Sequence, residues 1–246
     1  MTLPGDLPFE RTLVVAPHPD DESLGAGGLI AHVARRGANV RVVFLTHGEN
    51  NPWPQRIARR RWHISDHDRR EWGRARRREA KRALIALGVP PQAAIFLEYP
   101  DDGLPQLEKN ALPETIARVL REFRPTLLVI PSADDFHPDH RATHRAVQRA
   151  LAGEGIEHPE LILGYVVHGS LTAREQQWVD ISDEERLRKR DAIKRHATQM
   201  MLSRGRFLRY ARREELYAVV TDLDVQEETR LVRWKAKVRH ILSLLF

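Results

Sequence analysis

The chain has 246 residues, no cysteine and a formal net charge of +6. This length suits a single α/β domain, and the lack of cysteine excludes disulfides and zinc sites built on thiolates. No run of about eighteen apolar residues occurs, which excludes a membrane-spanning helix. The first eleven residues do not follow the basic-then-apolar pattern of a signal peptide, so we expect a cytoplasmic protein.

Hydrophobic patterning predicts alternating strands and helices along the first half of the chain. Short apolar runs predict strands at 11–16, 40–45 and 94–97. Longer amphipathic segments predict helices at 24–35 and 66–87. Residues 50–54 contain two prolines and two asparagines, and we expect a loop there.

The second half continues the same alternation. Strands are predicted at 127–130, 161–167 and 177–180, and helices at 113–123, 140–151 and 183–200. This βαβ rhythm predicts a Rossmann-like α/β fold: a largely parallel sheet with helices on both faces, in three αβα layers. Residues 1–224 are expected to form that single domain.

The last segment, 225–246, has a different pattern. Apolar residues recur at helical spacing among basic ones, which predicts an amphipathic helix. Two interpretations stay open. The helix docks on the body or on a second subunit as a homo-oligomer contact, or it lies on an anionic membrane surface as a peripheral anchor.

Charged residues follow the first predicted strand directly, in the motif His18-Pro-Asp20-Asp21-Glu22. Open α/β sheets place ligand sites at the carboxyl ends of their strands. Neighbouring carboxylates raise one another's pKa unless a cation shares the site, and histidine is a common metal ligand. The motif therefore indicates a metal site.

A second motif, His137-Pro-Asp139-His140, follows the predicted strand 127–130. Hydrolytic zinc sites use about three ligands from His, Asp and Glu and leave a position for water. We expect His18, Asp21 and His140 to form that set. His144, one helical turn after His140, is a rival ligand.

The remaining groups of the two motifs have the chemistry of a hydrolase. Asp20 is expected to act as the general base on the attacking water. His137 is expected to donate a proton or to stabilise an oxyanion, and Asp139 to orient a histidine ring.

Residues 56–82 hold twelve Arg or Lys against four Asp or Glu, a local charge of +8. A solvated helix face explains such an excess, and so does an anionic partner such as a phosphate-bearing lipid, a nucleotide-linked sugar or nucleic acid.

At these motifs the chain resembles the PIG-L superfamily of zinc-dependent de-N-acetylases, over about its first two hundred residues. Weaker matches occur in the same order, at Thr46-His47-Gly48-Glu49, Arg76-x-x-Glu79, Tyr99 to Gly103 and Lys194-x-His196-x-x-Gln199. His47 departs from the small or acidic residue typical of the family. The resemblance implies Zn²⁺ on His18, Asp21 and His140, Asp20 as base, His137 polarising the scissile carbonyl, and Arg76 near the substrate.

We therefore expect a metal-dependent hydrolase that removes the acetyl group from an N-acetylglucosamine-type sugar conjugate. An anionic or lipid-linked conjugate would fit the basic segment. The alternatives are another metal-dependent amide or phosphoester hydrolase, and a nucleic-acid-binding protein with a structural metal, which we do not favour.

Overall fold

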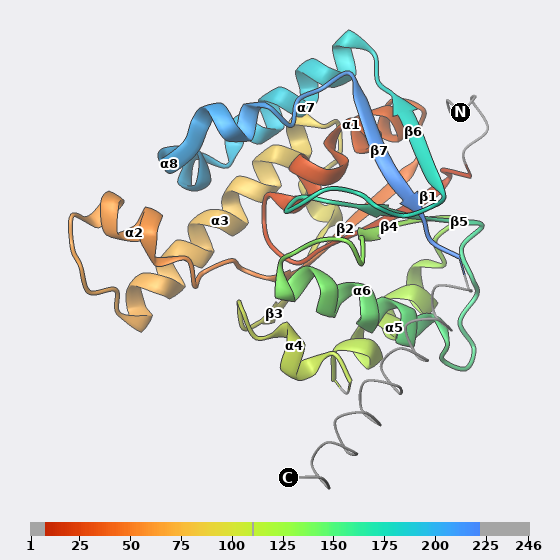
Figure 1. Cartoon of the computed structure of the whole chain (residues 1–246), viewed down its shortest axis with the longest axis horizontal. Helices are drawn as coiled ribbons and strands as arrows, with labels where there is room; N and C mark the ends of the chain where they lie inside the picture. The colour runs from red at the N-terminus through yellow and green to blue at the C-terminus, as the bar shows by residue number, and fades with distance from the viewer. Residues whose placement is uncertain (1–7, 110, 222–246) are drawn as a thin grey trace, which may run out of the picture.

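Seven strands form one sheet in the order β3-β2-β1-β4-β5-β7-β6. The structure, a computed structural model, describes residues 8–109 and 111–221 (Figure 1). The strands are β1 (Arg11–Ala16), β2 (Asn39–Thr46), β3 (Ala94–Tyr99), β4 (Leu127–Pro131), β5 (Leu161–Tyr165), β6 (Gln176–Asp180) and β7 (Glu214–Val219). β1 to β5 pair in parallel, and β7 is antiparallel to both β5 and β6. The predicted largely parallel α/β sheet is confirmed.

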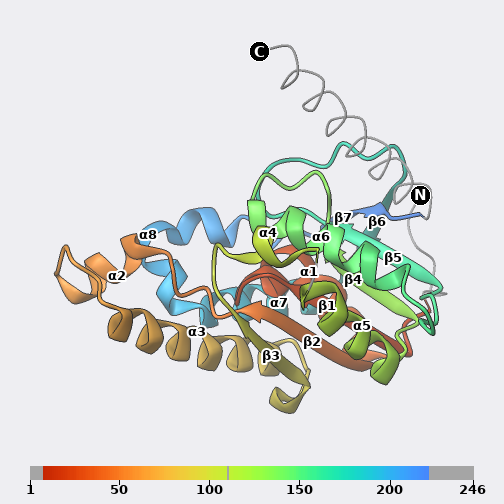
Figure 2. The same cartoon turned by 90° about the horizontal axis from the view of Figure 1, so that it is seen from below.

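Helices cover both faces of the sheet (Figures 1 and 2). They are α1 (Asp21–Arg35), α2 (Pro52–Arg59), α3 (Asp66–Ala86), α4 (Leu104–Leu107), α5 (Ala111–Phe123), α6 (Pro138–Leu151), α7 (Asp183–Arg195) and α8 (Ala197–Leu208), with a short 3-10 helix η1 (Pro91–Ala93).

Side-chain alternation along β1 divides the core into two layers. Val14 and Ala16 face a cluster that includes buried residues of α1, α3 and α7. Leu13 and Val15 face a second cluster, with residues of α5 and α6. Since both faces of the sheet are covered, its central strands are largely apolar, which is why they could be recognised in the sequence.

The predicted helix at 183–200 is in fact two helices. α7 ends at Arg195 and α8 begins at Ala197, because His196 takes a non-helical conformation with φ −80° and ψ 60°. The His196 ring is held by the fully buried Glu22, with Nε2 2.9 Å from Oε1. This long-range contact gives no periodic signal in the sequence.

Four other elements of the described residues were not predicted: the short η1 and α4, and also α2 and β7. The expected loop at 50–54 contains the start of α2, where Asn51 caps the helix and Pro52 occupies its first position. β7 escaped detection because Glu214 and Glu215 interrupt its apolar pattern. Glu215 is nevertheless buried, and its carboxylate accepts hydrogen bonds from the Gly28 and Leu29 amides at 2.8 Å.

The amphipathic helix predicted at 225–246 lies outside the described residues. Within 8–109 and 111–221, no helix is long and apolar enough to cross a membrane.

The strand order reverses direction between the neighbouring strands β1 and β4. The helix after β1 packs in one layer and the helix after β4 in the other. A crevice at the carboxyl ends of two such strands is the usual ligand site of an open α/β sheet. Both sequence motifs follow these two strands.

Candidate active site

The first motif forms a tight turn between β1 and α1. The His18 amide donates a hydrogen bond to Asp21 Oδ2 at 2.9 Å, and the Thr46 hydroxyl donates to the Pro17 carbonyl at 2.9 Å. Asp20 has φ 130°, a region that non-glycine residues rarely occupy. Its amide donates to Glu22 Oε2 at 2.9 Å, which helps to hold this strained conformation.

The second motif begins α6. His137 is the N-cap residue, and its Nδ1 accepts a hydrogen bond from the Asp139 amide at 3.2 Å. Asp139 is fully buried, and its oxygens accept the amides of Asp102 and Leu104 at 2.9 and 3.2 Å. The loop after β3 is thereby attached to the start of α6.

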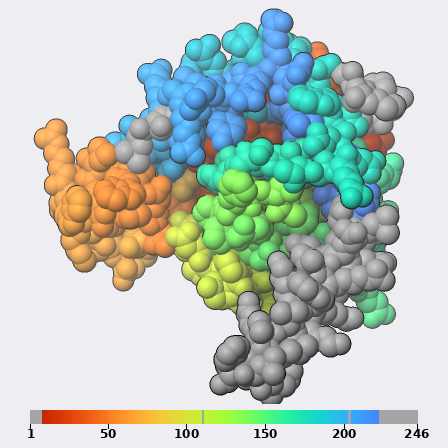
Figure 3. Space-filling view, viewed as in Figure 1, coloured from red at the N-terminus to blue at the C-terminus, as the bar shows by residue number. Residues whose placement is uncertain are grey.

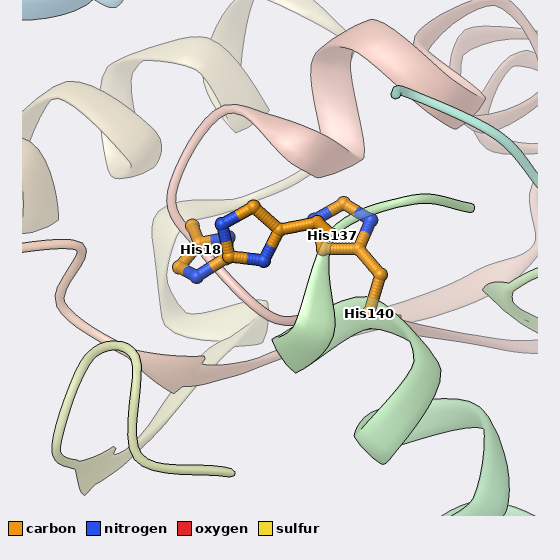
Figure 4. A group of neighbouring side chains, drawn as sticks. All are labelled: His18, His137 and His140. Atoms are coloured by element: carbon orange, nitrogen blue, oxygen red, sulfur yellow. The ribbon is translucent and has the colours of Figure 1, made fainter. Parts of the chain in front are cut away.

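The two motifs meet at the switch point. Asp21 Oδ2 lies 3.1 Å from His18 Nδ1 and 3.1 Å from His140 Nε2. The His137 ring lies 4.9 Å from that of His18 and 5.2 Å from that of His140, centroid to centroid (Figure 4). His18 Nε2 lies 3.3 Å from Asp139 Oδ2, although the two residues are 121 positions apart in the chain.

This donor set fits a divalent cation. Both ring nitrogens of His140 are buried 3.0 to 3.1 Å from carboxylate oxygens of Asp135 and Asp21, without the alignment of a hydrogen bond. Burial alone would lower the pKa of His18, but the carboxylates of Asp101, Asp139 and Asp21 raise it well above its ordinary value. Surroundings that favour positive charge on a ring also favour a metal ion.

Three sets of side chains have potential ligand atoms within 4.8 Å of one another at this site: His18 with His137 and His140, Asp21 with His140 and His168, and His18 with Asp101 and Asp139. Imidazole and carboxylate ligands suit Zn²⁺ and similar metals. The exact ligand set remains the prediction made from the sequence.

Asp20 is held by Arg76. Arg76 Nη2 lies 3.0 Å from Asp20 Oδ1 and 2.5 Å from the Pro19 carbonyl, and Nη1 lies 2.6 Å from the Gly48 carbonyl. Burial raises the pKa of Asp20 to about 6, and the Arg76 charge opposes that rise. Gly48 has φ 62°, and a Cβ there would overlap the guanidinium, so this position requires glycine.

A cavity of about 460 Å³ opens above the cluster. Five of the seven predicted site residues line it, namely His18, Asp20, Asp21, Arg76 and His137, and the fully buried Asp139 and His140 lie behind them. His47 and His144 do not line it. His144 instead places Nδ1 2.9 Å from the Pro131 carbonyl.

Sequence reasoning assigned no role to Asp101 and His168, which line this cavity close to the histidine rings. Asp101 Oδ1 lies 3.1 Å from His18 Nε2. It belongs to the loop that matched the resemblance, which was a usable signal. His168 follows β5 without a recognisable motif, and its ring lies 5.4 Å from that of His137 and 5.3 Å from that of His140.

Part of the positive charge of the basic segment 56–82 is paired with carboxylates of the same segment and of β3. Arg59 pairs with Asp68 and Glu71, each at 2.8 Å, and Arg77 pairs with Glu98 at 2.8 Å. Arg56 lies between two exposed indoles, 5.0 Å from the ring of Trp53 and 4.8 Å from that of Trp62.

Fold and site together define an α/β protein with a His/Asp cluster in a cavity at the topological switch point. The chain belongs to the PIG-L family: the family model described as GlcNAc-PI de-N-acetylase matches residues 13–151. A curated relative from Mycobacterium sp. (strain KMS), named 1D-myo-inositol 2-acetamido-2-deoxy-alpha-D-glucopyranoside deacetylase, is 37% identical over 158 residues. That match covers 57% of this chain and 50% of the relative, so the chain spans about half the length of the relative.

Solved structures support the fold. The N,N'-diacetylchitobiose deacetylase of Pyrococcus horikoshii aligns with a TM-score of 0.70 and 24% identity, over 89% of this chain and 88% of its own. The 4-carboxy-2-hydroxymuconate hydratase of Pseudomonas putida KT2440 aligns with a TM-score of 0.59 and 23% identity, over 82% of each chain. Because this fold also occurs in a hydratase, the fold does not decide the reaction.

Proposed function

We propose that the protein is a zinc-dependent hydrolase that removes an N-acetyl group from a GlcNAc-type amino-sugar conjugate. The observation that carries this proposal is the convergence of both His-Pro-Asp motifs in one cavity, in a chain of a family described by de-N-acetylation. The names of the curated relative and of the chitobiose deacetylase point to the same bond.

His18, Asp21 and His140 would hold the metal. Their side chains converge within 3.1 Å of a shared carboxylate oxygen of Asp21. A divalent cation at this position would acidify a water molecule and polarise the acetyl carbonyl.

Asp20 is the general base in this proposal. Its carboxylate lines the cavity next to the proposed ligands, where it can accept the proton of the attacking water. Arg76 positions Asp20 through the 3.0 Å contact. The role of Arg76 as a substrate contact stays a prediction, since its guanidinium also bonds two main-chain carbonyls.

His137 stabilises the developing oxyanion. Because its Nδ1 accepts the Asp139 amide, the neutral ring carries its proton on Nε2, which makes Nε2 a hydrogen-bond donor. Asp139 fixes this arrangement through the amides of Asp102 and Leu104 and also lies 3.3 Å from His18 Nε2. Collapse to the amine needs one proton, which either Asp20 or His137 can return.

The test is release of acetate from a panel of N-acetylated sugars, nucleotide sugars and lipid-linked glycans, before and after removal of metal with a chelator. We expect acetate and a free amine in equal amounts, with activity restored by Zn²⁺. Release of phosphate instead would identify a phosphoesterase, and hydration of an unsaturated acid without acetate release would also overturn the proposal. Salt-sensitive nucleic-acid binding without hydrolysis would favour the binding-protein alternative.

A further inference from the structure

A second cavity, of about 480 Å³, adjoins the first. The two share a wall made of Leu24, Val167, Arg206 and Tyr210. The Tyr210 hydroxyl donates a hydrogen bond to the Val167 carbonyl at 2.6 Å, which fixes this wall. Figure 3 shows a hollow between the teal segment that follows β5 and the blue segment of α8 and β7.

Three exposed arginines line this second cavity: Arg206 in the last turn of α8, and Arg209 and Arg212 in the segment that leads to β7. Among the described residues, none of the three forms an ion pair, and the only side-chain bond of the set is Arg212 Nε to the Arg209 carbonyl at 3.3 Å. Three guanidinium groups without carboxylate partners around one hollow produce a local positive potential and can bind oxyanions in a bidentate manner.

Acidic residues of the same cavity do not cancel this charge. Glu215 is buried, and its carboxylate is already bound to Lys189 Nζ, the Tyr217 hydroxyl and two amides of α1. Glu214 is exposed, so one acidic group faces three arginines. The unpaired charge of the cavity is therefore positive.

The position of the cavity relates it to the substrate. Apart from Leu24 and Gly25, its lining comes from residues 166–216, which lie outside the segment 13–151 matched by the family. The reaction centre lies on the family segment, whereas this cavity is a feature of the rest of this chain. The shared lining residues place this cavity next to the space proposed for the sugar.

We propose that the second cavity binds an oxyanionic group, a phosphate or carboxylate, carried on the aglycone of the substrate, with Arg206, Arg209 and Arg212 as its contacts. The inference rests on the proposed deacetylase function and adds a substrate class to it. It assigns recognition of the anion to these arginines on α8 and the following segment.

The test uses two matched substrates, 2-phosphoethyl and 2-hydroxyethyl N-acetylglucosaminide, which differ only in the terminal phosphate. We expect the zinc-loaded enzyme to prefer the anionic substrate in kcat/KM. Arg209→Gln combined with Arg212→Gln should reduce that preference by about tenfold to a hundredfold, the usual effect of losing charge-assisted hydrogen bonds. The preference should also fall as salt is raised.

Arg204→Gln is the matched control, because Arg204 is exposed on the same helix and lines neither cavity. It should leave the preference unchanged. An equal kcat/KM for both substrates in the wild type, or an unchanged preference in the double variant, would overturn the inference while the deacetylase function stands.

Direct binding separates the two proposals. Calorimetric titration of the 2-phosphoethyl glycoside should show binding that weakens in the double variant but not in Arg204→Gln. If this holds and no acetate is released from any substrate, the anion site is supported and the deacetylase function fails. To exclude attraction by a lipid surface as the source of the anion preference, the titration is carried out without vesicles. Binding of the glycoside that is equal in all variants contradicts the anion site.

Discussion

At the scale of single residues, neighbouring acids of one motif have opposite environments. Asp21 lies between two imidazoles, and although burial alone would raise its pKa, His140 and His18 hold that pKa well below the ordinary value. Asp20, one residue earlier, has an unusual backbone angle, and its carboxylate contacts Arg76. One carboxylate thus suits metal binding and the other proton transfer.

Asp20→Asn tests this division. The amide keeps the size of the side chain but cannot accept a proton from water, so kcat should fall by about two to four orders of magnitude. Zinc content, measured by elemental analysis after dialysis, should stay near one ion per chain. Loss of zinc in Asp20→Asn together with its retention in Asp21→Asn would reverse the two roles.

His137→Ala should act on turnover rather than on metal. The lost Nε2 donor meets charge that develops in the transition state, so kcat should fall on the order of a hundredfold with a smaller change in KM. Steady-state kinetics and metal analysis on the same preparation give the comparison. Intact turnover with loss of metal would require a different ligand set.

At the scale of elements, a specific terminal contact holds the helix that carries Arg76. α3 begins with a capping box: Ser65 Oγ accepts the Asp68 amide, and Asp68 Oδ2 accepts the Ser65 amide at 3.0 Å. α3 carries Arg76, so this cap helps to set the direction of the helix that positions Asp20. The break at His196 likewise brings Gln199 of α8 to the cavity.

The cap predicts a pH dependence. Hydrogen bonds from Ser65 lower the pKa of Asp68 from 3.8 to about 2. Because the folded pKa lies below the unfolded one, the stabilisation is complete above the unfolded value and is lost as the pH falls through the folded value. Urea unfolding measures the free energy of unfolding of wild type and of Asp68→Asn. The difference between these two free energies should be smaller at about pH 3 than at about pH 6.

Asp66→Asn provides the control for that measurement, since Asp66 is exposed in the same turn and is not part of the capping box. The difference in free energy of unfolding between Asp66→Asn and wild type should change less between the two pH values than the difference for Asp68→Asn. If the loss of unfolding free energy in Asp68→Asn is the same at both pH values, this carboxylate does not contribute to the cap.

At the scale of the whole molecule, one buried ion pair connects three elements. Lys189 of α7 contacts Glu215 of β7, which in turn accepts two amides of α1. α1 carries Asp21 and Glu22 at its start. The antiparallel end of the sheet is thereby attached to the helix that begins at the candidate site.

Lys189→Met should destabilise the protein by about 3–5 kcal/mol, because it leaves a buried carboxylate without its cation. Arg188→Met is the matched control: this neighbouring residue forms an exposed pair with Glu184, and its loss should cost about 0.5 kcal/mol or less. Chemical denaturation of both variants measures the contrast. Equal effects would contradict a structural role for the buried pair.

The sequence by itself determined six of the seven described strands, all but β7, together with the order of the α/β units and the two His-Pro-Asp motifs. Local chemistry explains this: central strands buried on both faces are largely apolar, and charge directly after such a strand is easily recognised in the sequence. The sequence analysis expected His18 and His140 to share a metal because each follows a predicted strand, at the end where open α/β sheets bind ligands. That β1 and β4 are neighbours is shown by the structure.

Only the tertiary structure decided the rest. The split at His196 depends on Glu22, the strand β7 depends on α1 and Lys189 to bury Glu215, and Asp101 and His168 join the site through loops that no periodic pattern marks. Each of these features comes from a contact between residues far apart in the chain. Such contacts stabilise buried charge that local preferences would place in solvent, and so a reading of neighbouring residues does not reveal them.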